Sequence, residues 1–430
     1  REQPRSQPHS TVPNTSKSQG TMGADRSNSR EHLRAVLQRV TSVQRIRNCG
    51  SRPVEGASLV TVRWSPDQRE IGGSSFSGLQ SCESWACPTC AARLSIAHQA
   101  DVHAVLNGAD AEGKTIAFLT LTMRHRAGQS LDRLWDASGK GWDSVVRTPA
   151  WLHKERGDAK QFGVEGWIRS TEVTQGANGW HVHLHVALIL REGVSDNEIQ
   201  ALGSKMFARW QRKLSSLKLT PDNVNGFRID RAFDAEGIAA YVTKSGQALY
   251  GMAAEMALSE TKQAAKGSRT TWQILDALRA AEAASDVSAY ERELALWLEW
   301  EKSQHGRRRL SMSRGLRDKF YLPAETASIE TDSETGQSWY AIAGLPRDEW
   351  KMKFAKNVPL QHFIREELTR AKRLGHARGI WTELADAMGI DYYDPESDAP
   401  LEVKPLPITP EQRRAHAKAE ARALLRLKSA

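Results

Sequence analysis

The sequence predicts an α+β fold in which antiparallel strands and helices share one core. Residues 115–123 (TIAFLTLTM) are β-branched and apolar, which is typical of a strand buried on both faces. Residues 167–174 and 180–190 predict a strand pair joined by a glycine-rich turn. Residues 195–217 predict a helix, because Ser at the first position and Glu198 form a capping box. This mixed order favours an α+β domain over a repeat protein.

The composition indicates a globular protein of two or three domains with a positive net charge. The chain has 430 residues, and its 60 Lys and Arg residues exceed its 51 Asp and Glu residues, for a net charge of +9. This balance favours a polyanionic partner such as nucleic acid, although an ordinary basic protein would share it. The sequence has no run of 18 apolar residues and no signal-peptide pattern, so we expect a cytoplasmic protein that binds no membrane.

The chain divides into four predicted regions, of which the first three cover its N-terminal part and centre. Residues 1–32 are rich in Ser, Pro, Gln and Asn and have too few apolar side chains to offset the entropy of ordering, which predicts a disordered tail. The sequence begins with Arg1, and Met22 is an alternative start. Residues 33–100 predict a small N-terminal module with a cysteine cluster, and residues 101–325 contain the main strands and helices.

The fourth region, residues 326–430, is predicted to be mostly helical, and the sequence assigns it no role. It opens with a hairpin-like segment, residues 338–350 (SWYAIAGLPRDEW). Its last part, residues 405–430, is rich in Ala, Arg and Lys. This pattern favours a flexible, solvated helix over one that touches DNA.

Four cysteines are predicted to bind a zinc ion. Cys82, Cys87 and Cys90 have C-x4-C-x2-C spacing, and Cys49 could complete a set of four. In a reducing compartment this grouping indicates metal ligands rather than a disulfide framework. The alternative is a set of buried thiols without metal, because a symmetrical pair of CxxC motifs is absent. The zinc would brace the N-terminal module or help it to dock DNA.

Three histidines on one strand predict a second metal site. His181, His183 and His185 alternate with aliphatic residues, so all three imidazoles project from the same face of the strand. His183 and His185 are the favoured ligands, with His181 beside them, because apolar residues follow His185 directly. The alternative is a surface strand with chance histidines, or a histidine face held by hydrogen bonds. Neutral imidazole is the commonest metal ligand, which favours the metal site.

Glu172 is predicted to be the third ligand of this site. A four-residue connection, residues 176–179, places Gln175 opposite Trp180 and hence Glu172 opposite His183. A shift of one residue would turn the carboxylate to the other face of the sheet. In that case Glu172 would be an ordinary exposed strand residue.

Tyr241 is the candidate nucleophile. It lies in a helical pattern with Lys244 three residues later, which puts both side chains on one helix face. A protonated tyrosine is a poor nucleophile, so its chemistry needs a metal that polarises the target and a nearby cation such as Lys244. Taken alone, a helical tyrosine is more often a packing residue.

Together these motifs resemble those of the HUH endonuclease superfamily, and in particular the single-tyrosine initiators of plasmid rolling-circle replication. The motifs are FLTLT (118–122), HVHLHV (181–186) and YVTK (241–244), and they occur in the family order. The cysteine cluster before them and GRRRLSMSRGLR (306–317) after them extend the resemblance over residues 49–317.

The resemblance implies a central five-stranded antiparallel sheet flanked by helices, with the histidine strand in the middle. It also implies a nickase that cuts one strand at the plasmid origin, forms a 5′-phosphotyrosine link and leaves a 3′ hydroxyl for synthesis. Mg²⁺ or Mn²⁺ is the implied ion at the histidine site. The implied partners are origin DNA, single-stranded at the nick, and a host helicase and polymerase.

The sequence departs from the family at the residue that activates water during termination. Some single-tyrosine initiators have a glutamate about one turn before the tyrosine, where this chain has Gly237. Glu236, five residues before Tyr241, and Asp234 are the nearest substitutes. Glu236 faces elsewhere on an ideal helix.

Residues 108–115 (GADAEGKT) match a phosphate-loop pattern but are predicted not to bind a nucleotide. A phosphate loop leaves a strand and opens a helix, whereas this segment follows a helical pattern and precedes a strand. Asp110 and Glu112 would also repel phosphates.

Two other functions fit part of the pattern. A transposase or conjugative relaxase of the same superfamily would share the three motifs, although residues 306–317 favour replication. A non-catalytic, zinc-containing DNA-binding protein would share the cysteines and the basic charge.

Overall fold

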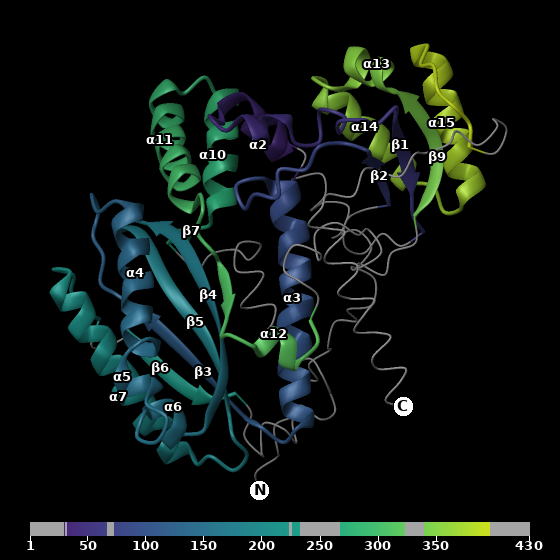
Figure 1. The fold of residues 1–430 in the computed structure, drawn as a ribbon. Coiled ribbons are helices and arrows are strands. Elements are labelled where there is room, and N and C mark those ends of the chain that lie inside the picture. Colours follow the sequence, from purple (N-terminus) through teal and green to yellow (C-terminus); the bar gives the residue numbers. More distant parts are fainter. Residues whose placement is uncertain are drawn as a thin grey trace, which may run out of the picture. The chain divides into compact units, whose positions relative to one another are not determined.

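The computed structural model describes residues 30, 32–66, 73–222, 226–232, 267–322 and 339–395 (Figure 1). These residues confirm the predicted α+β class, because helices accompany two antiparallel sheets. They form two compact units, and each is described by itself.

The larger unit contains a six-stranded antiparallel sheet. The strand order is β6-β3-β5-β4-β7, and β8 pairs separately with β4. The strand that carries the histidines, β5, therefore lies in the middle, as the resemblance implied. The implied number of five strands differs from the six described, because the short strand β8 adds to the same side of β4. The bounds are β3 (Thr115–Thr122), β4 (Val164–Gly176), β5 (Gly179–Leu190), β6 (Phe227–Arg231), β7 (Ser268–Arg269) and β8 (Leu310–Met312).

Helices cover both faces of this sheet (Figure 1). On one face, α4 (Leu131–Val146) and α7 (Asp196–Ser216) pack on each other and on the strands. On the opposite face, α3 (Pro88–Ala111) joins Ala187 and Ile189 of β5 in one buried cluster. The remaining helices of the unit are α2 (Gln44–Asn48), α5 (Pro149–Leu152), α6 (Asp158–Gln161), α10 (Thr271–Ala283), α11 (Val287–Gln304) and α12 (Leu316–Lys319).

Alternation along β5 fixes the direction of the histidines. Val182, Leu184 and Val186 are buried to 1% exposure or less, and their apolar burial anchors the strand. Side chains of alternate residues leave opposite faces of a strand. The histidines therefore project from the face on which α3 also packs, at a different level along β5.

The smaller unit has a three-stranded antiparallel sheet of order β2-β1-β9, with helices after β9. Its core includes Val60, Val62, Leu345, Trp350 and Trp381, all buried. The elements are β1 (Leu59–Trp64), β2 (Ser74–Ser77), β9 (Tyr340–Pro346), α13 (Arg347–Glu349), the π-helical turn η3 (Trp350–Phe354), α14 (Val358–Thr369) and α15 (Leu374–Met388).

The smaller unit differs from two expectations drawn from the sequence, the hairpin at residues 338–350 and the domain boundaries. In the part of this segment that the structure describes, residues 339–350, there is no hairpin: one strand, β9, pairs with β1, and a helical turn follows. This pairing joins distant segments, as in the pair Thr61 and Gly344, which are 283 residues apart in the sequence. The observed units therefore do not follow the boundaries at 100–101 and 325–326, because local sequence patterns do not reveal long-range strand partners.

Two predictions of local structure in the larger unit are confirmed: the capping box at Ser195, and the order of helix and then strand around residues 108–115. The Ser195 hydroxyl accepts a hydrogen bond from the Glu198 backbone N–H, and the Glu198 carboxylate accepts one from the Ser195 N–H. The segment that matches a phosphate loop runs from the end of α3 into β3, and Lys114 pairs with Glu165 at 2.8 Å. In the described part of the chain, no helix is both long and apolar enough to cross a membrane.

Candidate metal centre

The central strands β4 and β5 bring three predicted ligands together. Their connection is short, with Gly176 opposite Gly179 and Gln175 opposite Trp180. Glu172 consequently lies opposite His183, as the sequence predicted. Because directly opposed residues share a face, the carboxylate points toward the histidines.

The geometry of this group suits a metal ion. Each of Glu172, His183 and His185 offers a ligand atom, and the three atoms lie within 4.8 Å of one another. The Nε2 atoms of His183 and His185 lie 2.7 and 3.0 Å from the Glu172 carboxylate oxygen Oε2. A cation that replaced the protons in these hydrogen bonds would meet two imidazole nitrogens and one carboxylate oxygen. That ligand set is common for divalent metals.

The electrostatics keep Glu172 ionised. Burial alone would raise the pKa of this carboxyl group, but the hydrogen bonds from His183 and His185 outweigh burial. The net effect holds the pKa of Glu172 well below its ordinary value. A carboxylate that is charged at neutral pH is ready to bind a cation.

The three side chains of the group are only partly buried, so solvent can reach them. The side chains of Glu172, His183 and His185 are 20%, 14% and 9% exposed, so the ligand atoms are held firmly but are not sealed from solvent. The Nδ1 atom of His183 is buried without a hydrogen-bond partner among the described residues.

His181 stands beside the group of three rather than within it. Burial, reinforced by the neighbouring imidazoles of His183 and His125, lowers the pKa of His181 to about 4. The ring is therefore neutral at pH 7, and its Nε2 lies 2.8 Å from the Thr122 hydroxyl. His125 stacks on it with ring centroids 4.7 Å apart.

Sequence reasoning missed His125 and the threonines of β3. Thr120 and Thr122 lie opposite His185 and His183 on the neighbouring strand, so their hydroxyls line the same polar surface. His125 follows β3 closely in the sequence and reaches the same row of imidazoles. The signal was available in the sequence: alternate residues of FLTLT are polar, and MRH continues directly from them.

The predicted nucleophile is not placed by the structure. Tyr241, Lys244, Glu236 and Asp234 all lie outside the described residues. Their roles stay predictions from the sequence.

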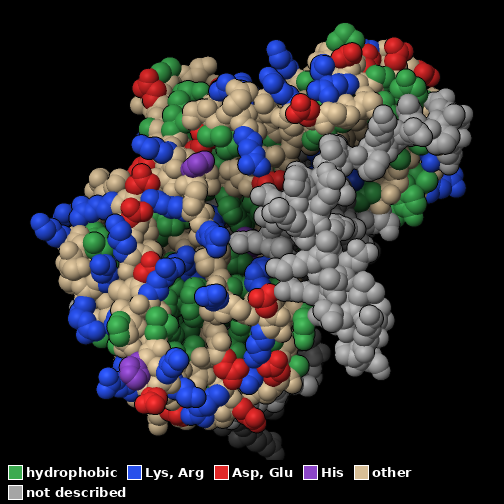
Figure 2. Space-filling model, in the orientation of Figure 1, with side chains coloured by type: hydrophobic (Ala, Val, Ile, Leu, Met, Phe, Trp, Pro, Cys, Tyr) green, Lys and Arg blue, Asp and Glu red, His purple; other side chains and the backbone are tan. Residues whose placement is uncertain are grey.

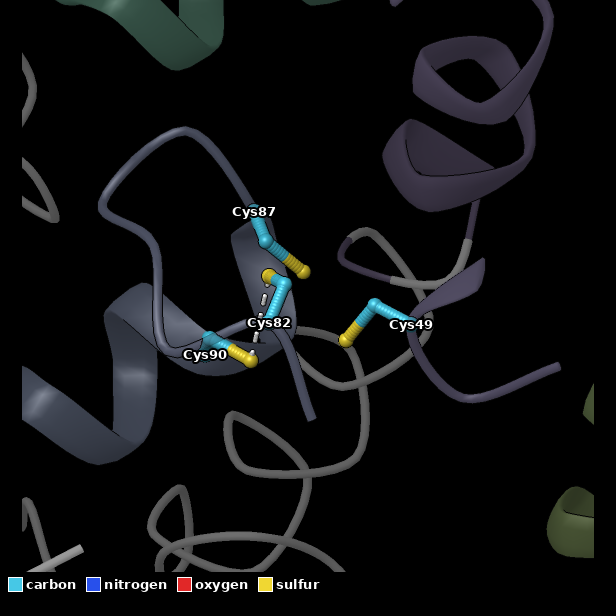
Figure 3. Close-up of side chains that lie close together, drawn as sticks. All are labelled: Cys49, Cys82, Cys87 and Cys90. Carbon is cyan, nitrogen blue, oxygen red and sulfur yellow. Dashed lines mark hydrogen bonds between the residues drawn. The ribbon is translucent and has the colours of Figure 1, made fainter. Parts of the chain in front are cut away.

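The four cysteines form a second group that could hold a metal ion (Figure 3). The Sγ atoms of Cys49, Cys82, Cys87 and Cys90 lie within 4.8 Å of one another, and all four residues are buried. They form no disulfide bond. Cys87 precedes α3 and Cys90 lies in its first turn, so the tight CPTC turn presents two thiols together. Four thiolates at this separation suit a tetrahedral ion.

Basic side chains are not gathered into one patch on the visible face of the described residues. Figure 2 shows Lys and Arg side chains interspersed with Asp and Glu over the visible face of the described residues.

A family model and two relatives show that the chain is similar to replication proteins. Residues 75–336 match the family described as "Replication protein" (Rep_1). A "Protein rep" from Streptomyces lividans is 28% identical over 309 residues, which cover 59% of this chain and 67% of that protein. A "Protein rep" from Lentilactobacillus hilgardii is 28% identical over 155 residues, or 35% of this chain and 46% of that protein.

A third relative has a different name. The "Neomycin resistance protein" of Streptomyces cyanogenus is 29% identical over 143 residues, which cover 28% of this chain and 32% of that protein. No solved structure matches the chain.

Proposed function

We propose, from the premise that this chain belongs to the replication protein family, that it starts plasmid replication by nicking one strand of the origin. The reaction would join the 5′ phosphate to Tyr241 and leave a 3′ hydroxyl for rolling-circle synthesis. The partners would be origin DNA, single-stranded at the nick, and a host helicase and polymerase.

The observation that carries this proposal is the group of Glu172, His183 and His185 on the two central strands. Adjacent strands of one sheet hold these side chains in fixed register, which is the preorganisation that phosphoryl transfer needs. The group is also reachable from solvent, unlike the cysteine cluster.

The residues have separate roles in the proposed reaction. Glu172, His183 and His185 would hold Mg²⁺ or Mn²⁺, with His181 beside them. A divalent ion in that position would polarise a phosphate and stabilise its developing charge. The Tyr241 oxygen would attack the phosphorus, so that an O–P bond forms to tyrosine while the bond from phosphorus to the 3′ oxygen breaks.

Charge and proton transfer complete the step. The Lys244 ammonium would lie one turn from Tyr241 and balance the negative charge of the tyrosine oxygen. The tyrosine proton would pass to solvent, and the 3′ oxygen would gain a proton. Glu236 or Asp234 would be the nearest carboxylate for activating water at termination.

The cysteine cluster would have a structural role. Zn²⁺ bound by Cys49, Cys82, Cys87 and Cys90 would fix the start of α3, since metal binding at such sites is coupled to folding. We place no reaction step at this site.

Incubation with the supercoiled native replicon and Mn²⁺ tests the function. We expect the wild-type protein to convert supercoiled plasmid to open circles, and Tyr241→Phe to bind the plasmid without nicking it. Sequencing the cleaved 5′ end would locate the nick. A protein that binds the plasmid with Mn²⁺ present but never nicks it would instead be a non-catalytic DNA-binding protein.

A further inference from the structure

The smaller unit contains two consecutive helices joined by a short turn. Helix α14 ends at Thr369 and α15 begins at Leu374, so only Arg370 to Arg373 connect them. Helix pairs with connections of three or four residues are typical of helix-turn-helix DNA-binding motifs. In such motifs the second helix enters the major groove.

The helix pair is fixed by a buried core. Leu368 and Ala371 from α14 and the turn cluster with Ala377, Trp381 and Ala385 of α15, and all five are at most 1% exposed. The same cluster contains residues of the three-stranded sheet, on which both helices pack (Figure 1). The exposed face of α15 is therefore held rigidly, as a recognition surface requires.

The exposed face of α15 forms a continuous stripe. Lys372, Gly375, His376 and Gly379 follow helical spacing and are all exposed, whereas Ala377 and Trp381 point into the core. Further along the stripe, the exposed residues are Thr382, Glu383 and Asp386. The stripe has no large apolar side chain, which disfavours a second protein copy as its partner.

The charges on this stripe are divided between its two halves. Lys372 and Arg373 lie in the turn directly before α15, where Arg373 is the N-cap, and neither forms an ion pair with another residue of the described ranges. Glu383 and Asp386 lie in the second half. Only the first half complements a polyanion, and it is the N-terminal part of a recognition helix that reaches the bases.

Two glycines leave room for a close approach. Ideal Cβ atoms at Gly375 and Gly379 would have no heavy atom within 4 Å outside the local backbone. Both glycines lie in a regular helix, where glycine is unfavourable relative to alanine. Packing within the described residues does not require them, so the helix backbone at these two positions is open to close approach by a partner.

We propose that this face of α15, formed by Lys372, Arg373, Gly375, His376 and Gly379, binds double-stranded DNA in the major groove. The short turn between the helices, their rigid packing and the two basic residues directly before α15 all suit a duplex. The proposal rests on the proposed function in one respect only, that DNA is the substrate. It adds a duplex contact that is separate from the nick site.

Binding of a labelled 30-base-pair random-sequence duplex by the full chain tests the proposal. Lys372→Ala/Arg373→Ala should lower affinity by at least about tenfold near 0.1 M salt and reduce the slope of log K against log salt by about 2. The matched control, Arg52→Ala/Lys356→Ala, removes two exposed charges from the same unit and should change either quantity by far less.

Gly379→Gln provides a test in which stability and binding should move in opposite directions. Replacing this exposed helical glycine should raise the melting temperature, because glutamine is the better helix former. The longer side chain should nevertheless weaken binding of the same duplex, because it occupies the space of the groove. Loss of binding together with loss of folding would instead indicate a structural role for the position.

The outcomes separate this proposal from the proposed nickase. If Lys372→Ala/Arg373→Ala loses duplex binding but still cleaves a single-stranded oligonucleotide spanning the nick, both proposals stand. Equal affinity of this variant and its control for the duplex overturns the α15 contact, whatever the nicking result. A variant that changes the sedimentation mass but not the duplex affinity would identify a protein partner and also overturn it.

Discussion

The histidine group and the cysteine cluster can both hold a metal ion, yet they differ in burial and in chemistry. The four cysteines are at most 4% exposed, whereas the Glu172 side chain of the histidine group is 20% exposed. Thiolates around a closed site are typical of structural zinc, while imidazoles and a carboxylate that remain accessible are typical of catalytic sites. Access and ligand type, rather than the number of ligands, therefore favour a catalytic role for the histidine group and a structural role for the cysteine cluster.

The two groups also differ in how the chain assembles them. The histidine group comes from adjacent strands whose register a short connection fixes, so its geometry follows from local structure. The cysteine cluster needs Cys49, which is 33 residues from Cys82 in the sequence. Loss of metal should therefore damage activity at the first site and stability at the second.

The largest expected effect comes from removing both favoured histidines. His183→Ala/His185→Ala should abolish Mn²⁺-dependent nicking of the supercoiled replicon, since two of three ligands are lost, while the circular dichroism spectrum and most DNA affinity stay unchanged. His103→Ala/His305→Ala, a control outside the site, should nick normally. Nicking at the wild-type rate by the first variant would mean that the metal site lies elsewhere.

Removing the carboxylate should have a smaller effect of the same kind. Glu172→Gln keeps the size of the side chain but removes its charge, so the Mn²⁺ concentration needed for half-maximal nicking should rise at least tenfold, given that changes around the ligands alone typically cost about 10–100-fold. Glu165→Gln, on the same strand, is the matched control. An unchanged Mn²⁺ requirement in Glu172→Gln would remove Glu172 from the ligand set.

The smallest expected effect on nicking comes from the cysteine cluster. Purified protein should hold about one zinc per chain, and Cys87→Ser should lose it and melt at a lower temperature. The nicking rate per folded molecule should stay within about twofold of wild type, because no step occurs at this site. Elemental analysis that finds no zinc in protein purified without chelators would contradict this assignment, and a rate loss at full folding would make the cluster part of the active site.

Local sequence patterns were sufficient for the elements that build the histidine group. The alternation in residues 180–190 gave the histidine face, and the length of the connection gave the pairing of Glu172 with His183. Ser195 and Glu198 gave the start of α7. Each of these features depends on residues close in sequence, for which periodicity and capping are direct physical signals.

Features that depend on distant segments could not be predicted in this way. The pairing of β1 with β9 joins strands that are far apart in the sequence, and the sequence of neither strand indicates which other strand it pairs with. The helix-turn-helix arrangement was missed for the same reason, because its helices become a rigid pair only on the sheet that these strands form. His125 differs from these features, because its position directly after FLTLT and MR was visible in the sequence, and only its stacking on His181 depends on the path of the chain after β3.

In the proposed reaction, Tyr241 becomes covalently joined to DNA. Reaction of the full chain with Mn²⁺ and a labelled oligonucleotide that spans the nick should give an adduct stable to SDS and heat. Mass spectrometry should place the 5′ phosphate on the peptide that contains Tyr241, because transesterification conserves the phosphodiester energy in the protein–DNA bond. Tyr241→Phe, which keeps the ring, should give no adduct. An undiminished adduct from Tyr241→Phe, or a phosphate mapped to Tyr250, would show that Tyr241 is not the nucleophile.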